Sequence, residues 1–192
     1  ELQPRAMVFN MGPATIRWVG NEDGLAADPC EYVTDSTDLN NYDDDVIGLG
    51  GQQYLPPECD VSIRRGWFWQ PEDEPKSLEH LLAIHDRSIG LGANLLLNIP
   101  PDRRGRLDPA DLARVRELGE ALRARFGNGR GASMTPTNNG VTAELPSAER
   151  FDHVELREDV SAGQRARAHR VLAADGTLLA QGRTVGVRRI HR

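Results

Sequence analysis

Residues 94–99 read NLLLNI, and this short stretch decides the fold class. A continuous apolar run of strand length is typical of a parallel strand in a sheet that is covered on both faces. Pro100 and Pro101 follow and end the strand, because proline has no amide to donate to a sheet ladder. The run therefore predicts a parallel strand, which needs helices nearby to cover it.

Helical patterns stand on both sides of this run. Before it, Ser77 can cap a helix whose apolar side chains recur at helical spacing and which ends at Gly90 and Gly92. After it, Asp108 and Pro109 predict a second helix that runs to about Phe126. The apolar positions of the two helices are Leu78, Leu81, Leu82, Ile84 and Ile89, then Leu112, Val115, Leu118 and Leu122.

Two further strands are expected upstream, at residues 6–10 and 59–63, whereas residues 25–57 have no clear periodicity and predict a long irregular loop. The order strand, loop, strand, helix, strand, helix predicts an α/β segment with parallel strands. Residues 128–149 are rich in Gly, Asn, Thr and Ser and read as a linker.

Beyond the linker the pattern changes to that of antiparallel strands. Segments 152–157, 164–172 and 178–187 predict strands, and Asp175-Gly176 predicts the hairpin turn between the last two. Residues 150–192 therefore read as the opening of an antiparallel β domain.

Composition excludes several classes of function. The chain has 192 residues, of which 39% are hydrophobic and 27% charged, as in globular proteins. A net charge of −6 without a basic block argues against a nucleic-acid partner, and no apolar run approaches the roughly 20 residues of a membrane helix. Cys30 and Cys59 leave one disulfide open. No metal site is expected, since there is no Cys/His cluster and Asp43–Asp45 lacks the spacing of a calcium loop.

The strongest chemical candidate is RWVGNE at residues 17–22, directly after the first expected strand, where parallel α/β folds place catalytic groups. Trp18 can present a flat face to a sugar ring, Asn21 can bond hydroxyls, and Glu22 can give or take a proton. On residue types alone, a surface glutamate in a turn is the favoured alternative.

A second group of residues surrounds the end of the strand at 59–63, namely Glu58, Asp60, Arg64, Trp67 and Trp69. An ion pair with two core aromatics is the alternative interpretation. All three tryptophans of the chain lie in these two segments, a bias typical of carbohydrate sites.

Three stretches closely resemble bacterial α-L-fucosidases of glycoside hydrolase family 29: RWVGNE at 17–22, LPPECDVSIRRGWFW at 55–69 and NLLLNIPPDRRGRL at 94–107. Residues 151–171 and 182–190 resemble the β-sandwich domain that follows the barrel in that family. The resemblance implies the C-terminal half of a (β/α)8-like TIM barrel at 1–127, a linker at 128–149 and a partial antiparallel β-sandwich at 150–192. RWVGNE resembles the branch that favours α-1,3 and α-1,4 fucosyl linkages.

The resemblance also implies the roles of the residues. Glu22 maps to the general acid/base of a retaining exo-fucosidase, and Trp18, Asn21, Arg64 and Trp67 are expected to contact substrate, with Trp67 walling the fucose pocket. The family nucleophile is an aspartate in a W-x-D-G-type motif upstream, which residues 1–21 do not contain, so residues 1–192 alone are expected to be inactive. The family usually has an aspartate directly before RWVGNE, where this chain has Ala14 after Pro13.

The implied substrate is a fucosylated oligosaccharide or glycoconjugate, with no cofactor or metal. For the intact protein a secreted or periplasmic location fits this family. A non-catalytic carbohydrate-binding module is the alternative function, since tryptophan-bearing loops also serve binding domains.

Overall fold

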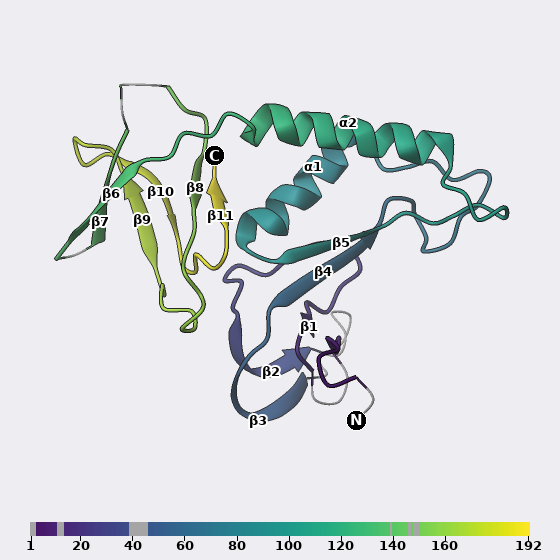
Figure 1. The fold of residues 1–192 in the computed structure, drawn as a ribbon, viewed down its shortest axis with the longest axis horizontal. Helices are drawn as coiled ribbons and strands as arrows, with labels where there is room; N and C mark the ends of the chain where they lie inside the picture. Colours follow the sequence, from purple (N-terminus) through teal and green to yellow (C-terminus); the bar gives the residue numbers. More distant parts are fainter. Residues whose placement is uncertain (1–2, 11–13, 39–45, 139, 146, 148–149) are drawn as a thin grey trace.

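The computed structural model describes residues 3–10, 14–38, 46–138, 140–145, 147 and 150–192 (Figure 1). Its central feature is a three-stranded sheet in the order β1-β4-β5, formed by β1 (Arg17–Trp18), β4 (Pro57–Ser62) and β5 (Asn94–Asn98). Both strand pairs are parallel. The parallel strand predicted from NLLLNI is therefore confirmed, in register with β4 from Glu58↔Asn94 to Ser62↔Asn98.

Helices cover one face of this sheet. Parallel neighbours need a crossover, and α1 (Leu78–Arg87) with the 3₁₀ turn η1 (Ile89–Leu91) supplies it between β4 and β5. α2 (Pro109–Phe126) follows β5 and packs beside α1 (Figure 1). The core between them contains Val61, Ile63, Leu81 and Ile84, with these partly buried side chains packed against it: Leu95, Leu97, Ile99, Val115 and Leu118.

The predicted helix starts are confirmed by their caps. The Ser77 hydroxyl accepts a hydrogen bond from the His80 amide at 3.2 Å, and the Asp108 carboxylate accepts one from the Ala110 amide at 2.9 Å. One residue of the predicted apolar stripe differs, because Leu112 is exposed. The neighbouring Asp111 is buried instead, since its carboxylate has a charged partner inside the protein.

Three further predictions are corrected by the structure. Residues 6–10 do not form a buried strand: Phe9 makes an isolated bridge with Ile16, and the side chains of Met7 and Phe9 are exposed. Within 25–57, β2 (Val33–Asp38) and β3 (Val46–Tyr54) form an antiparallel hairpin with a bulge. Its glycines and amides hide the alternation that marks a strand in sequence. Asp43–Asp45 lie outside the described residues.

β5 is covered on one face only within the described residues. Leu96 is 44% exposed, and it stands in register with Asp60 of β4, on the face away from the helices. The expectation of a strand covered on both faces is therefore not met in this part of the chain. The uncovered face is the one that carries the polar side chains of the site.

The C-terminal part consists of antiparallel strand pairs, as predicted. β8 (Val154–Leu156) pairs with β11 (Arg189–His191), and β9 (His169–Leu172) pairs with β10 (Leu178–Gly182). The expected turn at Asp175-Gly176 is present, with Asp175 accepting from the Thr177 amide at 2.9 Å and Gly176 at φ 87°. The segment predicted as a linker holds a further exposed hairpin, β6 (Ser133–Thr137) with β7 (Gly140–Glu144).

Polar contacts fasten this part to the segment before β2. Arg189 of β11 is 4% exposed and donates to both carboxylate oxygens of Asp28, at 3.0 and 2.8 Å. The Tyr32 amide donates to the Gln164 side chain at 2.8 Å. The C-terminal strands therefore pack directly on the residues that lead into the β2–β3 hairpin.

Cys30 and Cys59 are free, buried thiols in one hydrophobic cluster, so the disulfide that the sequence left open is not formed. Burial raises the pKa of the Cys30 thiol to about 11 and that of Cys59 to about 12. Within the described ranges, no helix has the length and apolar character to cross a bilayer, and no three His, Cys, Asp or Glu side chains cluster as metal ligands would.

Candidate active site

Glu22 lies on a loop that leaves β1 and folds back over the end of β4. The Val19 amide donates to the Glu58 carbonyl at 3.2 Å, and the Gly24 amide donates to the Asp60 carbonyl at 3.1 Å. Gly24 has φ +73°, and a Cβ there would lie 2.8 Å from Ile84 Cγ2. A glycine at this position lets the loop lie directly on the core, and this fixes where Glu22 begins.

Asn21 holds the same loop together from inside. Its side chain is 6% exposed, its Oδ1 accepts from the amides of Asp23 and Leu25 at 3.1 and 3.3 Å, and its Nδ2 donates to the Leu25 carbonyl at 2.8 Å. The sequence suggested that Asn21 bonds substrate hydroxyls. The geometry instead gives it a structural role, since its amide is used within the loop.

Glu22 and Trp67 meet across 45 residues of sequence. Trp67 follows β4, and its indole Nε1 donates a hydrogen bond to Glu22 Oε2 at 2.6 Å. The two groups of candidate residues, around 17–22 and around 58–69, are therefore one site. It lies at the carboxyl ends of β1 and β4, the edge at which parallel α/β sheets bind ligands.

A second tryptophan makes the same kind of contact nearby. Trp18 Nε1 donates to Asp60 Oδ1 at 2.6 Å. Burial raises the pKa of Asp60 and the charges of Glu22 and Glu58 add to this, while the bond from Trp18 opposes it. Three carboxyl groups thus influence one another on the uncovered face of the sheet. Glu58 itself accepts from Asn94 Nδ2 at 2.6 Å.

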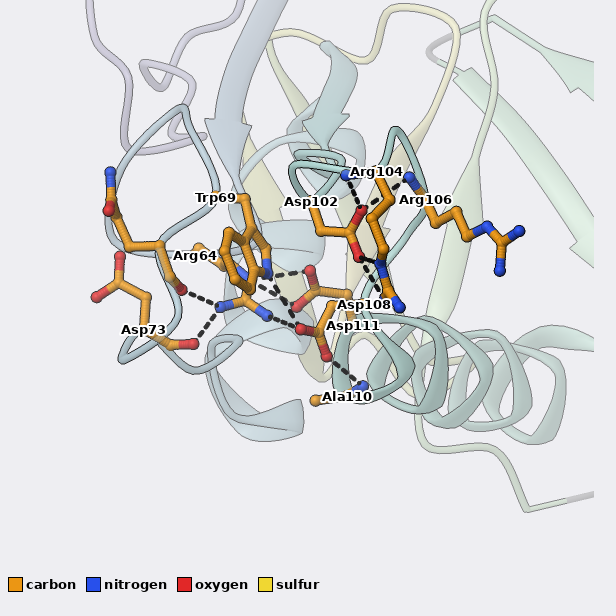
Figure 2. Close-up of polar contacts among 10 residues, drawn as sticks. Arg64, Trp69, Asp73, Asp102, Arg104, Arg106, Asp108, Ala110 and Asp111 are labelled. Carbon is orange, nitrogen blue, oxygen red and sulfur yellow. Dashed lines mark hydrogen bonds and ion pairs between the residues drawn. The ribbon is translucent and has the colours of Figure 1, made fainter.

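Arg64 was also expected to contact substrate, and the structure places it inside the protein (Figure 2). It is 2% exposed, and its Nε donates to both carboxylate oxygens of Asp111, at 3.0 and 2.9 Å. Its Nη1 donates to the backbone carbonyls of Gln70 and Asp73. Arg64 therefore acts on the loop that carries Trp67, which we call the aromatic loop (residues 65–76).

The aromatic loop is also held to the start of α2. Trp69 Nε1 donates to Asp108 Oδ2 at 3.0 Å, and its ring centroid lies 5.9 Å from the Arg64 guanidinium. Figure 2 shows a neighbouring contact in which Arg104 and the Arg106 amide bond to Asp102. These hydrogen bonds, those from Arg104 first, lower the pKa of Asp102 to about 2.

Sequence reasoning missed two residues that hold this loop. Lys76 Nζ donates to the carbonyls of Ser62 and Arg64 at 2.7 and 2.8 Å. Asn98, at the end of β5, donates its Nδ2 to the Trp67 carbonyl and to Ser62 Oγ, both at 3.0 Å. The available signal was the polar asparagine that ends the otherwise apolar run NLLLNI.

A cleft of about 470 Å³ opens beside Glu22 and Trp67. Its floor includes Val61 of β4, and His80 of α1 forms part of the opposite wall. Lys76 also faces it, and burial lowers the pKa of this lysine. Glu22 is exposed at this cleft, so a ligand can reach its carboxyl group.

Comparison with known proteins identifies the family. Residues 30–126, half of the chain, match the family described as α-L-fucosidase. The chain belongs to the α-L-fucosidase family. The matched region contains the aromatic loop, Arg64, Asn98 and Asp111, and it begins after Glu22.

The fucosidase relatives are considerably longer than this chain. α-L-fucosidase 1 of Arabidopsis thaliana is 36% identical over 134 residues, which are 67% of this chain and 26% of the plant protein. The solved structure of SpGH29 is 31% identical with a TM-score of 0.78, over 97% of this chain and 49% of that one. A Ruminococcus gnavus GH29 fucosidase in complex with fucose is 28% identical with a TM-score of 0.75, over 97% and 46%. The chain therefore spans about a quarter to a half of these proteins.

Proposed function

We propose that this chain is the C-terminal part of a retaining exo-α-L-fucosidase that removes terminal α-1,3- or α-1,4-linked fucose from glycans. In this proposal residues 1–127 complete a (β/α)8-like barrel, 128–149 connect the domains, and 150–192 begin an antiparallel β-sandwich. The observation that carries it is the Glu22 carboxylate, exposed at a cleft and bonded by Trp67 at the carboxyl edge of a parallel sheet. Family membership and the similarity to a fucose-bound neighbour support the substrate class.

The proposed mechanism has two steps. A carboxylate attacks the anomeric carbon while Glu22 gives its proton to the departing glycosidic oxygen; Glu22 then takes a proton from the water that cleaves the fucosyl-enzyme ester. Retention requires the two carboxyl groups about 5–5.5 Å apart. We infer that the nucleophile comes from a part of the enzyme outside residues 1–192. The reaction needs only these two carboxyl groups and water.

The sugar would lie between the aromatic side chains. Trp18 and Trp67 are half-buried, and each uses its indole N–H on a carboxylate, so the ring faces are left for apolar contact. We propose that the face of Trp67 packs against the C6 methyl of fucose. Asn21 and Arg64 serve the site by holding the two loops rather than by touching the sugar.

Glu22→Gln in the full-length enzyme tests this function. General acid catalysis contributes roughly 10²–10⁴-fold, so hydrolysis of a natural fucosyl glycan should fall by about that factor. Hydrolysis of an aryl α-L-fucoside with an activated leaving group should fall much less, because its departure needs little protonation. Asp23→Asn, the same kind of change one residue away, should leave the ratio of the two rates as it is.

Equal losses on both substrates would remove Glu22 from the acid/base role. A full-length protein that binds a fucosylated glycan and never hydrolyses either substrate would support the non-catalytic binding module instead. Titration calorimetry with the glycan, run beside the kinetics, separates these two outcomes.

A further inference from the structure

The Trp67 indole offers two different surfaces, a ring face and an N–H edge, and the edge is already in use on Glu22. We propose that Trp67 is a positioning residue: its N–H fixes the carboxyl group of Glu22 and decides which of the two oxygens transfers the proton. This inference rests on the proposed function and adds a role to Trp67 that a wall of the sugar pocket does not need.

Glu22 needs such a contact because nothing else printed for its side chain restrains it. The residue is exposed, and an exposed glutamate side chain moves among several rotamers. A hydrogen bond of 2.6 Å from a neutral donor to a carboxylate is short and strong, and it selects one orientation. The backbone of the loop fixes where Glu22 begins, and Trp67 fixes where its carboxyl group ends.

The direction of the proton follows from the chemistry of indole. An indole N–H donates and cannot accept, so Oε2 must present a lone pair to Trp67. Oε1 is then the free oxygen. In the proposed first step the proton leaves Oε1 for the glycosidic oxygen as the C–O bond breaks, and in the second step Oε1 takes it back from water.

Trp67 can do this only if it is itself held, and the structure holds it from both sides. Asn98 of β5 donates to its backbone carbonyl at 3.0 Å. Arg64, locked on Asp111, bonds the Gln70 carbonyl further along the aromatic loop, and Lys76 closes the end of the loop on Ser62 and Arg64. Bonds to both sheet and helix thus place the indole N–H opposite Glu22.

Trp67→Phe in the full-length enzyme separates the two surfaces of the indole. Phenylalanine keeps an aromatic face for the sugar and removes the N–H. We expect hydrolysis of the natural fucosyl glycan to fall roughly 10- to 100-fold, the range for loss of a hydrogen bond to a charged group. The activated aryl fucoside should lose much less, and the melting temperature should stay close to that of the parent.

Trp69→Phe is the matched control. It lies on the same loop and loses the same kind of bond, from an indole to a carboxylate, but its partner is Asp108 and not Glu22. It should leave the ratio of the two substrate rates unchanged. The same change of ratio in both variants would assign the effect to the loop as a whole and overturn the proposal.

A double variant completes the test. With Glu22→Gln already present, adding Trp67→Phe should not alter the ratio further, because the proton donor is gone. If Trp67→Phe slows both substrates equally, the indole acts only as a wall and the proposal fails. If Glu22→Gln alone shows no preference for the activated substrate, the proposed function fails first, so the two failures are distinguishable.

Discussion

Arg64 and Asp111 form a buried ion pair in which one guanidinium nitrogen bonds both carboxylate oxygens, at 3.0 and 2.9 Å. Arg64 is 2% exposed, and the side chain of Asp111 is fully buried. One residue follows β4 and the other lies in the first turn of α2, so the pair ties the aromatic loop to the helix layer (Figure 2). Its integrity should govern both folding and the position of Trp67.

Asp111→Ala should destabilise the full-length protein by about 3–5 kcal/mol, because it leaves the Arg64 charge buried without compensation. Denaturant unfolding measures the change. Arg104→Met, which breaks an ion pair whose arginine is 71% exposed, should change stability by about 1 kcal/mol or less.

The double variant Arg64→Met with Asp111→Leu should recover much of the loss, since neither charge then remains in the interior. An Asp111→Ala protein as stable as the parent would show that the pair contributes nothing. Loss of activity with recovered stability would show that the pair also positions the aromatic loop.

Gly24→Ala should destabilise the loop that carries Glu22. The new Cβ would lie 2.8 Å from Ile84 Cγ2 and 2.9 Å from Val61 Cγ1, at a φ of +73°. Overpacking of about 1–3 kcal/mol then adds to about 1–2 kcal/mol of backbone strain. Thermal unfolding and the rate of glycan hydrolysis should both fall.

Gly105→Ala is the control for that prediction. Gly105 has the same φ of +73° and open space around it, so its replacement carries the strain without the clash. Equal losses of stability in the two variants would mean that the loop is not packed on the core as described.

Acid should loosen the C-terminal strands through His169 and His191. Their Nε2 atoms lie 2.7 Å apart, a contact that needs one donor and one acceptor and is lost when both rings are protonated. Burial lowers the pKa of both, and the charge of Arg189 adds to this, while Asp28 opposes it. Because the folded pKa lies below the unfolded value of about 6.5, this stability is present above that pH and declines as the pH falls below it.

The melting temperature between pH 7.5 and 5 measures this effect. His169→Gln with His191→Gln should flatten its decline, while His85, whose pKa burial also lowers, keeps part of the slope. An unchanged slope in the double variant would show that the pair does not couple to folding.

The sequence by itself determined the elements whose signals are local. Ser77 and Asp108 marked the helix starts, and NLLLNI marked a parallel strand, because a cap or an apolar run acts within a few residues. The sequence also placed Glu22 and Trp67 at the ends of neighbouring strands. The β2–β3 hairpin escaped prediction, since its glycines and amides carry no alternation.

Only the tertiary structure decided which partner each candidate side chain meets. Trp67 reaches Glu22, whereas Arg64 turns inward to Asp111 and Asn21 bonds its own loop. Residue type states what a side chain can donate or accept, and the contacts depend on how segments tens of residues apart pack. An arginine or asparagine beside a site therefore reads alike in sequence whether it touches substrate or holds a loop, because burial and hydrogen-bond geometry arise only when the chain is folded.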